Sequence, residues 1–363
     1  MRELNWLFNL RPQVSNFLES MQSHNIQGYY RYSYSGDIYD DSLHWNVGSS
    51  VFALKIYYTL GIENPEAIQD ASNYIKSFLH QNGLIYDDFI YNKGRLRNFL
   101  SAIKHNNLEN IFNQQYKRAE TRQCFSALML HGQLPEQQVR VSIPNTEIEI
   151  EAYLAKFNWN QPWGAGSHFS HLMFFLNLAL KVNQINQKTF EKLTNHAIKW
   201  VNSLQNSDDG GWYRGDVSER QIVNGAMKVI TGLIAVDKTE FQYPDKLVDL
   251  CLNVSNDQTA CDNFNVILVL NYASKLLGRS YRQNEIESFA LDRLKIYKKQ
   301  YYEDKGGFSF LPNSSNIYYY GVKITKGINE PDIHGTIMFL WGISIITQIL
   351  GIEHEFNFKV HKT

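Results

Sequence analysis

The hydrophobic and polar positions of this chain define two kinds of helical segment that alternate along it. Segment 188–204 is amphipathic, with apolar residues such as Leu193, Ala197 and Val201 at helical spacing. Segment 260–277 is apolar on nearly every side, as in its run from residue 266 to 270. Amphipathic helices cover a core with one face, whereas helices that are apolar all round are buried. The alternation therefore predicts pairs of helices, each with an outer and an inner member.

A short motif of glutamine, glycine and an aromatic residue recurs where the first helix of a pair ends. Four copies are present: Gln22 with Gly28-Tyr29-Tyr30, a reduced copy at Gln81-Asn82-Gly83, Gln205 with Gly210-Gly211-Trp212, and Gln300 with Gly306-Gly307-Phe308. Glycine permits the positive φ of a tight return. A repeat of this size cannot bury its own apolar face alone, so its copies must stack or close on one another.

Six helix pairs can be traced, at residues 14–60, 67–130, 147–182, 188–236, 244–277 and 285–350. The third and fifth lack a full glutamine–glycine motif. No linker rich in proline, glycine or serine divides the chain, so we expect a single domain spanning residues 1–363. The predicted fold is all-α, an (α/α)6 toroid built of six helix-hairpin repeats around a central cavity.

Composition narrows the classes of partner and the compartment. The formal net charge is -1 and the basic residues are dispersed, so we expect no nucleic-acid partner. The longest apolar stretch, 337–350, is too short for a membrane span, so no transmembrane segment is predicted. The start of the chain lacks an apolar signal segment, and three cysteines are a sparse, odd count, so we expect a cytoplasmic protein.

Polar residues gather where the loops enter the inner helices, at one end of the expected cavity. The candidates for catalysis are Asp40, Asp41, His44, His168, His171 and His334. The candidates for substrate binding are Arg118, Arg122, Trp163, Arg220, Asn224, Lys228, Asp262 and Asp332. Helix N-termini add unpaired N–H groups and a positive dipole end there. We expect the substrate to be a small or chain-like organic molecule.

Five of the binding candidates suit an anion. Arg220, Asn224 and Lys228 share one helix face at i, i+4 and i+8, on a helix too apolar for a solvated stripe. These three either pair with an acid or bind an anionic substrate. Arg118 and Arg122, which are also four residues apart, can join them around a diphosphate or carboxylate.

Other candidates have a chemical and a purely structural interpretation. His168 and His171 share a helix face and form a base–acid pair, a metal site, or simply part of the core. Trp163 can stack on a sugar or stabilise a carbocation with its π face. Asp40 and Asp41 are either N-caps of the following helix or proton donors.

The repeats resemble those of a known superfamily. Gln205 with Gly211-Trp212, and Gln300 with Gly307-Phe308, are similar to the QW-type repeats of terpenoid cyclases such as squalene–hopene cyclase and of protein prenyltransferase β-subunits. Segment 332–336, Asp-Ile-His-Gly-Thr, resembles the last unit of the prenyltransferases. The resemblance implies an α/α toroid and an isoprenoid cyclase-like or prenyl-transferring reaction. It also implies that Asp40 or Asp41 protonates the substrate, because class II terpene cyclases use an aspartate-rich string similar to residues 37–42.

Zinc binding follows from this resemblance only in part. The prenyltransferases bind zinc through an Asp two residues before a Cys and through a His directly before a Thr. Here Asp262 follows Cys261 instead, and Gly335 separates His334 from its threonine. A zinc site made of Cys261, Asp262 and His334 is chemically possible. It is not favoured, no metal ligand set is predicted, and the cofactor is left open.

Three functions remain open at this point. The first expectation is an isoprenoid enzyme with its active site in the central cavity. The second is a carbohydrate-active enzyme (polysaccharide lyase, hydrolase or epimerase), because α/α toroids also act on sugars. The third is a non-catalytic binding toroid. A dry aromatic cavity indicates an isoprenoid substrate, a polar groove with an exposed tryptophan indicates a sugar, and a plugged centre indicates a binding role.

Overall fold

The computed structural model describes residues 2–39, 42–112, 114–135 and 142–362, and over these residues the chain is mainly helical. The expected all-helical class is confirmed. Two small antiparallel sheets accompany the helices. In the first, β1 (Tyr301–Tyr302) pairs with β2 (Gly307–Phe308), and in the second, β3 (Tyr318–Tyr319) pairs with β4 (Val322–Lys323). Both sheets lie in the long connection before the last long helix.

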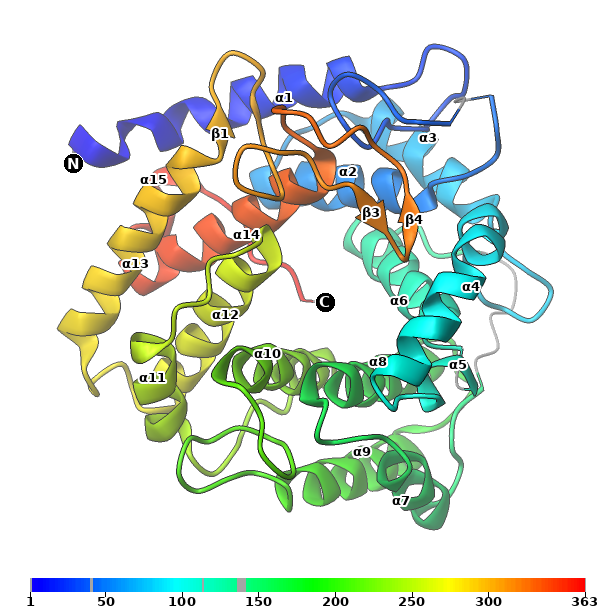
Figure 1. Ribbon diagram of the computed structural model, residues 1–363, viewed down its shortest axis with the longest axis vertical. Coiled ribbons are helices and arrows are strands. Elements are labelled where there is room, and N and C mark those ends of the chain that lie inside the picture. The colour runs from blue at the N-terminus through cyan, green and yellow to red at the C-terminus, as the bar shows by residue number, and fades with distance from the viewer. Residues whose placement is uncertain (1, 40–41, 113, 136–141, 363) are drawn as a thin grey trace.

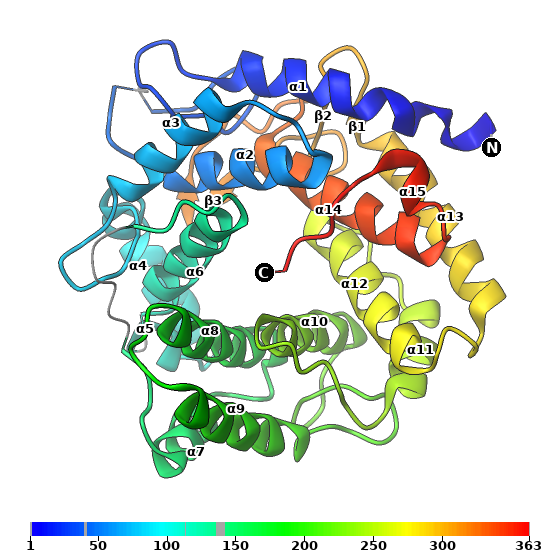
Figure 2. The ribbon, with the colours of Figure 1, turned by 180° about the vertical axis from the view of Figure 1, so that it is seen from behind.

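An inner set of helices packs in a closed cycle (Figures 1 and 2). Each helix contacts the next, and the last returns to the first. In order they are α2 (Val47–Leu60), α6 (Gln115–Leu130), α8 (Pro162–Lys181), α10 (Glu219–Ala235), α12 (Ala260–Leu276) and α14 (Ile333–Ile349). The count of six equivalent hairpin repeats remains a prediction.

A second set of helices lies outside this cycle in the same views. These outer helices are α1 (Leu10–Met21), α3 (Pro65–Lys76), α7 (Glu147–Ala155), α9 (Gln187–Asn202), α11 (Pro244–Asn253) and α13 (Gln283–Lys299). Two short helices lie near the ends of the chain: η1 (Arg2–Asn9) precedes α1, and α15 (Glu353–Phe356) follows α14. Within the described residues, every helix is too short or too polar to span a lipid bilayer.

The hydrophobic pattern explains why some helices lie in the inner set and others in the outer set. In α12 every residue from Asn263 to Leu270 is buried, so this part of the helix has no face left for solvent. In α9 the buried residues, which include Leu193, Ala197 and Val201, form one stripe. A single apolar stripe needs a core on one side only, whereas a helix that is apolar all round needs neighbours on every side.

The glutamine–glycine motifs form one recurrent turn. Antiparallel bridges close all four copies, as Gln22 with Tyr30, Leu79 with Ile85, Gln205 with Trp212, and β1 with β2. At Gly210 φ is +78°, and an added Cβ would lie 2.6 Å from the carbonyl oxygen of Tyr243 before α11. Only glycine fits such an approach without strain. The Gln205 side chain also accepts a hydrogen bond from the Gln242 N–H at 2.9 Å, so this turn joins one helix pair to the next.

The glycines at positions 164 and 166 predict a loop over residues 158–166 before the second helix of the third pair, and the structure shows that this prediction is wrong. Helix α8 already begins at Pro162, because proline is well suited to the first helical turn. Glycines in this region serve helix packing instead. A Cβ on Gly225 of α10 would lie 2.6 Å from the Cβ of Pro162, so the missing side chain lets α8 and α10 approach closely.

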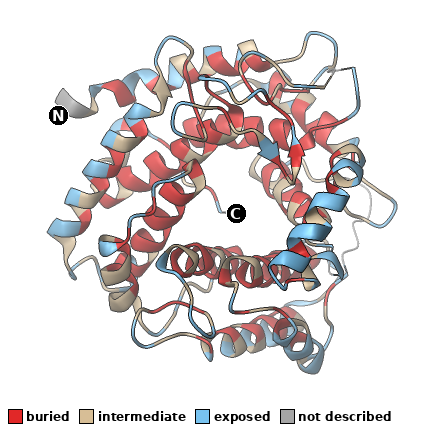
Figure 3. Cartoon of the chain, in the orientation of Figure 1, coloured by how far each residue is buried: buried red, intermediate tan, exposed pale blue. Residues whose placement is uncertain are grey.

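The insertion inside the second helix pair contains two further helices, α4 (Asp88–Lys104) and α5 (Glu109–Phe112). Helix α4 crosses one end of the ring beside α6 and α8 (Figure 1). Most of its residues are exposed (Figure 3). The Asp87 side chain caps it by accepting a hydrogen bond from the Ile90 N–H at 3.0 Å.

The C-terminal residues 357–362 run across the opposite end of the ring. The Lys359 N–H donates to the Thr59 carbonyl oxygen at 2.7 Å, near the end of α2. The imidazole of His361 is buried and stacks on Trp341 of α14, with ring centroids 3.9 Å apart. Lys362 forms an ion pair with Asp237, just beyond α10. Because α2 and α10 stand opposite each other in the cycle, this tail spans the rear of the ring.

Candidate functional site

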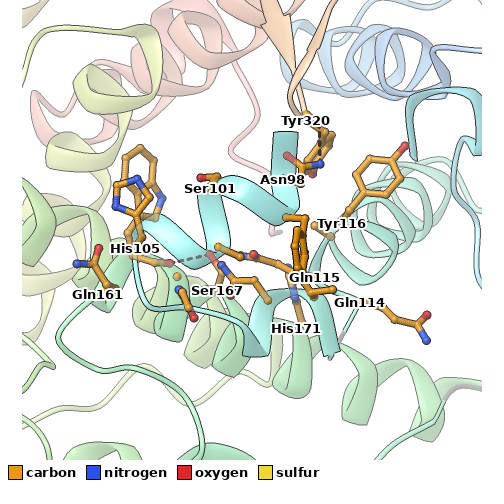
Figure 4. Close-up of a pocket in the computed structure, with 18 of the residues that line it drawn as sticks. Asn98, Ser101, His105, Gln114, Gln115, Tyr116, Gln161, Ser167, His171 and Tyr320 are labelled. Carbon is orange, nitrogen blue, oxygen red and sulfur yellow. Dashed lines mark hydrogen bonds between the residues drawn. The ribbon is translucent and has the colours of Figure 1, made fainter. Parts of the chain in front are cut away.

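A cavity of about 1070 Å³ opens at the N-terminal ends of α6, α8 and α10, and α4 and α5 form its other wall (Figure 4). Most of the side chains that line it are polar. None of the described residues lining it is an aspartate or a glutamate. The cationic groups among them are Arg95, Arg122 and Lys228. A cavity with cations and no carboxylate in its wall suits a negatively charged ligand.

Arg122 and Lys228 come from facing inner helices, α6 and α10. Arg122 is 3% exposed, and its Nε has no hydrogen-bond partner among the described residues. Burial, with a contribution from the charge of Arg122, lowers the pKa of Lys228 to about 8. Removing a charged group from water costs free energy unless an opposite charge accompanies it. Here the two cations oppose each other instead of being paired.

A third cation, Lys55 of α2, stands next to this pair and was missed from the sequence. Its side chain is 3% exposed and donates a hydrogen bond to the Gln123 Oε1 atom. Burial lowers its pKa to about 7, and the charges of Arg122 and Lys228 add to that effect. The sequence signal was available: Lys55 is the one charged residue in the apolar run 47–60.

Glu120 lies two residues before Arg122 on α6, yet it does not neutralise the cations. It is not among the lining residues, and its Oε1 accepts a hydrogen bond from the Tyr319 hydroxyl at 3.0 Å. Burial raises its pKa to about 8, so the carboxyl group is mainly neutral at pH 7.

Of the two α8 histidines, His171 faces the cavity and His168 does not. Burial, with the nearby charge of Arg122, lowers the pKa of His171 well below its ordinary value. Its Nδ1 has no partner among the described residues. His168 stacks on Phe157, with centroids 4.0 Å apart, and its Nε2 lies 2.9 Å from the Asn110 Oδ1. A neutral imidazole at the cavity wall can accept a proton once a bound anion offsets the neighbouring positive charges.

Arg220 and Asn224 belong to a structural network. The Arg220 guanidinium donates two hydrogen bonds to Asp262, from Nε at 3.1 Å and from Nη2 at 3.0 Å. The Asn224 amide donates to the same carboxylate at 3.1 Å, and the Thr259 hydroxyl donates at 2.8 Å. Asp262 is fully buried at the start of α12. Of the expected three-residue stripe, only Lys228 lines the cavity.

Asp332 and His334 shape the start of α14. The Asp332 carboxylate accepts hydrogen bonds from the N–H groups of Gly335, Phe310 and Asn316 at 2.7, 2.8 and 3.0 Å. Such a carboxylate anchors a loop. His334 Nδ1 lies 2.8 Å from the Tyr32 hydroxyl, and burial with the charge of Lys55 lowers its pKa to about 3.

A zinc set of Cys261, Asp262 and His334 would have to disrupt these arrangements. Asp262 is already bonded to Arg220, Asn224 and Thr259. In the described parts of the chain, no three His, Cys, Asp or Glu side chains are grouped so that they could hold a metal ion.

Of the remaining candidates, Trp163 is at the cavity and His44 and Arg118 lie elsewhere. His44 is exposed and stacks on Phe78 with centroids 3.8 Å apart, in a separate small hollow. The Arg118 guanidinium lies 4.6 Å from the Phe175 ring centroid and donates to the Ser142 carbonyl at 3.3 Å. Trp163 lines the cavity. Asp40 and Asp41 lie outside the described residues.

Comparison with known proteins gave no relative. No protein-family model matches the chain, and neither the curated proteins nor the solved structures yielded a match.

Proposed function

We propose that this chain is a carbohydrate-active enzyme that binds an acidic sugar in its central cavity. The observation that carries the proposal is a wall that contains Arg122 and Lys228 and, among its described residues, no carboxylate. A uronate carboxylate would supply the missing negative charge. Amide side chains around the cavity suit sugar hydroxyls, because each amide both donates and accepts hydrogen bonds. They include Asn92, Asn98, Asn107, Gln114, Gln161 and Gln221.

Among carbohydrate reactions, elimination fits these residues better than hydrolysis. Glycoside hydrolysis ordinarily uses a pair of carboxyl groups, and the described lining offers none. In the proposed lyase reaction, neutral His171 removes the proton from the carbon next to the uronate carboxylate. The bond from the neighbouring ring carbon to the glycosidic oxygen then breaks, and a carbon–carbon double bond forms. The Tyr320 hydroxyl, whose pKa burial raises well above its ordinary value, protonates the leaving oxygen.

The two cations have a defined part in this reaction. Removing a proton next to a carboxylate places additional negative charge on that carboxylate. Arg122 and Lys228 would stabilise this charge more than the charge of the bound substrate, which is the requirement for catalysis. Burial and the same cations keep His171 neutral. A bound carboxylate would offset these positive charges and raise the pKa of His171 toward the range in which an imidazole accepts a proton.

The test is turnover of uronate-containing oligosaccharides, followed by the ultraviolet absorbance of the unsaturated product. We expect product from an acidic oligosaccharide and none from its neutral counterpart. His171→Ala should reduce turnover by about 10² to 10⁴, the usual contribution of general acid–base catalysis, while ligand affinity changes little. Absence of both binding and turnover across a panel of acidic sugars would contradict the proposal.

An isoprenoid reaction is the second candidate, and one feature favours it. Leu96, Phe99 and Ile111 give the cavity an apolar side opposite the cations, which suits a prenyl diphosphate. A carbocation would be destabilised beside Arg122 and Lys228, so protonation-initiated cyclisation is less well supported than prenyl transfer. Release of diphosphate from a prenyl diphosphate, without any sugar product, would select this candidate. Ligand binding without any turnover would select the non-catalytic toroid.

We also propose that the inner and outer helices are the repeats of an (α/α)6 toroid, which the cyclic packing order supports. A cytoplasmic setting is proposed as well. It is supported by Cys124, Cys251 and Cys261, which are all free thiols.

A further inference from the structure

Exposed large hydrophobic side chains of the described residues are concentrated on α4, α5 and the turn between them. Seven of the sixteen large hydrophobic side chains exposed on the described surface fall between residues 96 and 112. The most exposed are Phe112 at 72%, Leu96 at 70%, Leu100 at 57% and Ile103 at 53%. Single exposed apolar residues are ordinary, but a cluster of this kind marks a surface that meets something apolar.

Basic residues border the apolar side chains of α4. Leu96, Leu100 and Ile103 recur at i, i+4 and i+7, so they form one ridge along the helix. Lys93, Arg97 and Lys104 follow one edge of that ridge, and Arg95 lies at the other edge; all four are exposed. Segment 88–112 contains these four basic residues and only two acidic ones, Asp88 and Glu109. Its net charge is therefore positive, although the net charge of the whole chain is -1.

We propose that α4 and α5 dock this protein on an anionic lipid surface, with the helix lying in the plane of the membrane. An apolar ridge with basic edges matches the boundary between acyl chains and acidic headgroups. A second copy of the chain fits less well, because pairing two such ridges would bring like charges together. Leu96 and Phe99 also line the central cavity, so docking would place the cavity entrance at the lipid surface.

Vesicle flotation of the full chain tests this inference. Vesicles of phosphatidylcholine are compared with vesicles that also contain phosphatidylglycerol, at low and high salt. We expect binding to the anionic vesicles, weaker binding to the neutral ones, and weakening by salt.

Three variants sharpen the test, each checked for native circular dichroism. Leu100→Asp should abolish flotation, and Lys104→Gln should weaken it about fivefold, in keeping with about 1 kcal/mol per basic residue at a charged membrane. The matched control is Ile148→Asp on α7, where the native side chain is 81% exposed, and this change should have no effect. Failure of the wild-type chain to float with any vesicle would overturn the inference. So would a wild-type dimer that Leu100→Asp dissociates, because the occupant would then be a second copy.

Discussion

Arg220 and Lys228 share one face of α10, yet one of them is paired with a carboxylate and the other has a second cation as its neighbour. Arg220 donates two hydrogen bonds to Asp262, within a network that Asn224 and Thr259 complete. Lys228, two turns further along, faces the cavity and has Arg122 as its charged neighbour. Spacing along a helix identifies residues that point the same way, but the partner on another helix decides what each residue does.

The charge of Arg220 stabilises the fold through its carboxylate partner, whereas the charge of Lys228 has no such partner among the described residues and is suited to bind an anionic ligand. A buried ion pair that loses one partner leaves the other charge uncompensated. The Arg220–Asp262 pair therefore couples α10 to α12 and resists removal. Around Lys228 the protein already tolerates uncompensated charge, which a bound anion would relieve. Mutations in the Arg220–Asp262 network should lower the stability of the fold, whereas mutations of the cavity cations, and changes of pH, should alter ligand affinity.

Asp262→Ala should have the largest effect. It removes the carboxylate that four hydrogen bonds hold and leaves Arg220 without its partner. We expect the free energy of unfolding to fall by about 2–3 kcal/mol, measured by urea denaturation, because the buried Asn224 amide loses its partner while Arg220, whose side chain is 36% exposed, can be hydrated. Asp245→Ala, on the partly exposed surface of α11, is the control and should change it little. A loss below about 1 kcal/mol for Asp262→Ala would show that this network is not structural.

Removing a cavity cation should affect binding and spare the fold. Lys228→Gln and Arg122→Gln are each expected to weaken an acidic ligand by about 2 kcal/mol, roughly 30-fold, which is typical for a hydrogen bond to a charged group. Calorimetric titration measures the affinity, and the unfolding curve should not shift to lower stability. Arg118→Gln is the matched control, because Arg118 is on the same helix and is not among the lining residues. Equal losses in all three variants would rule out a specific anion site.

The affinity for an acidic ligand should depend on pH in a defined direction. The pKa of Lys228 is lowered to about 8 and that of Lys55 to about 7, so part of each population is neutral near these values. A bound anion favours the charged forms, and binding therefore takes up protons. Affinity should rise as pH falls from 9 to 6, by about tenfold for each unit by which the ligand raises a lysine pKa. In Lys228→Met the rise between pH 9 and 8 should disappear, and a flat profile in the wild type would contradict this account.

Lys55→Met should give the smallest change, an increase of about 1 kcal/mol in the free energy of unfolding. The folded pKa of Lys55 is about 7, below its unfolded value of about 10.4, so folding disfavours the charged form. That penalty is complete below pH 7 and vanishes above about pH 10.4. The gain from Lys55→Met should accordingly be greatest near pH 7 and shrink as pH rises, as thermal unfolding across that range can check. Lower stability at pH 7 would mean that the bond to Gln123 matters more than the buried charge.

The helices were predictable because their signals are local. Asn64, Thr146, Asn186 and Thr259 cap helices with their side chains, so the starts of α3, α7, α9 and α12 follow from nearby sequence. Helix α4 was not predicted, because its apolar residues do not form the usual buried stripe. Much of its apolar ridge is exposed to solvent instead. An exposed ridge has no counterpart in a pattern that assumes burial.

The sequence places several candidate residues at the cavity, whereas the role of each of them stays a prediction. Arg122, Trp163, His171 and Lys228 lie at the cavity because loops of successive helix pairs enter at one end of the ring. The diversion of Arg220 to Asp262, 42 residues away, depends on how α10 packs against α12. No local pattern contains that information.

The tail formed by residues 357–362 limits how a chain-like ligand could pass through the ring. It spans the rear from Thr59 to Asp237, so it stands in the way of a long polymer that is drawn in at one end and passed out at the other. A ligand chain that enters past α4 would then have to leave by the same route. An enzyme with this geometry would shorten a polymer from its terminus and release small fragments from the start, instead of cutting at internal positions.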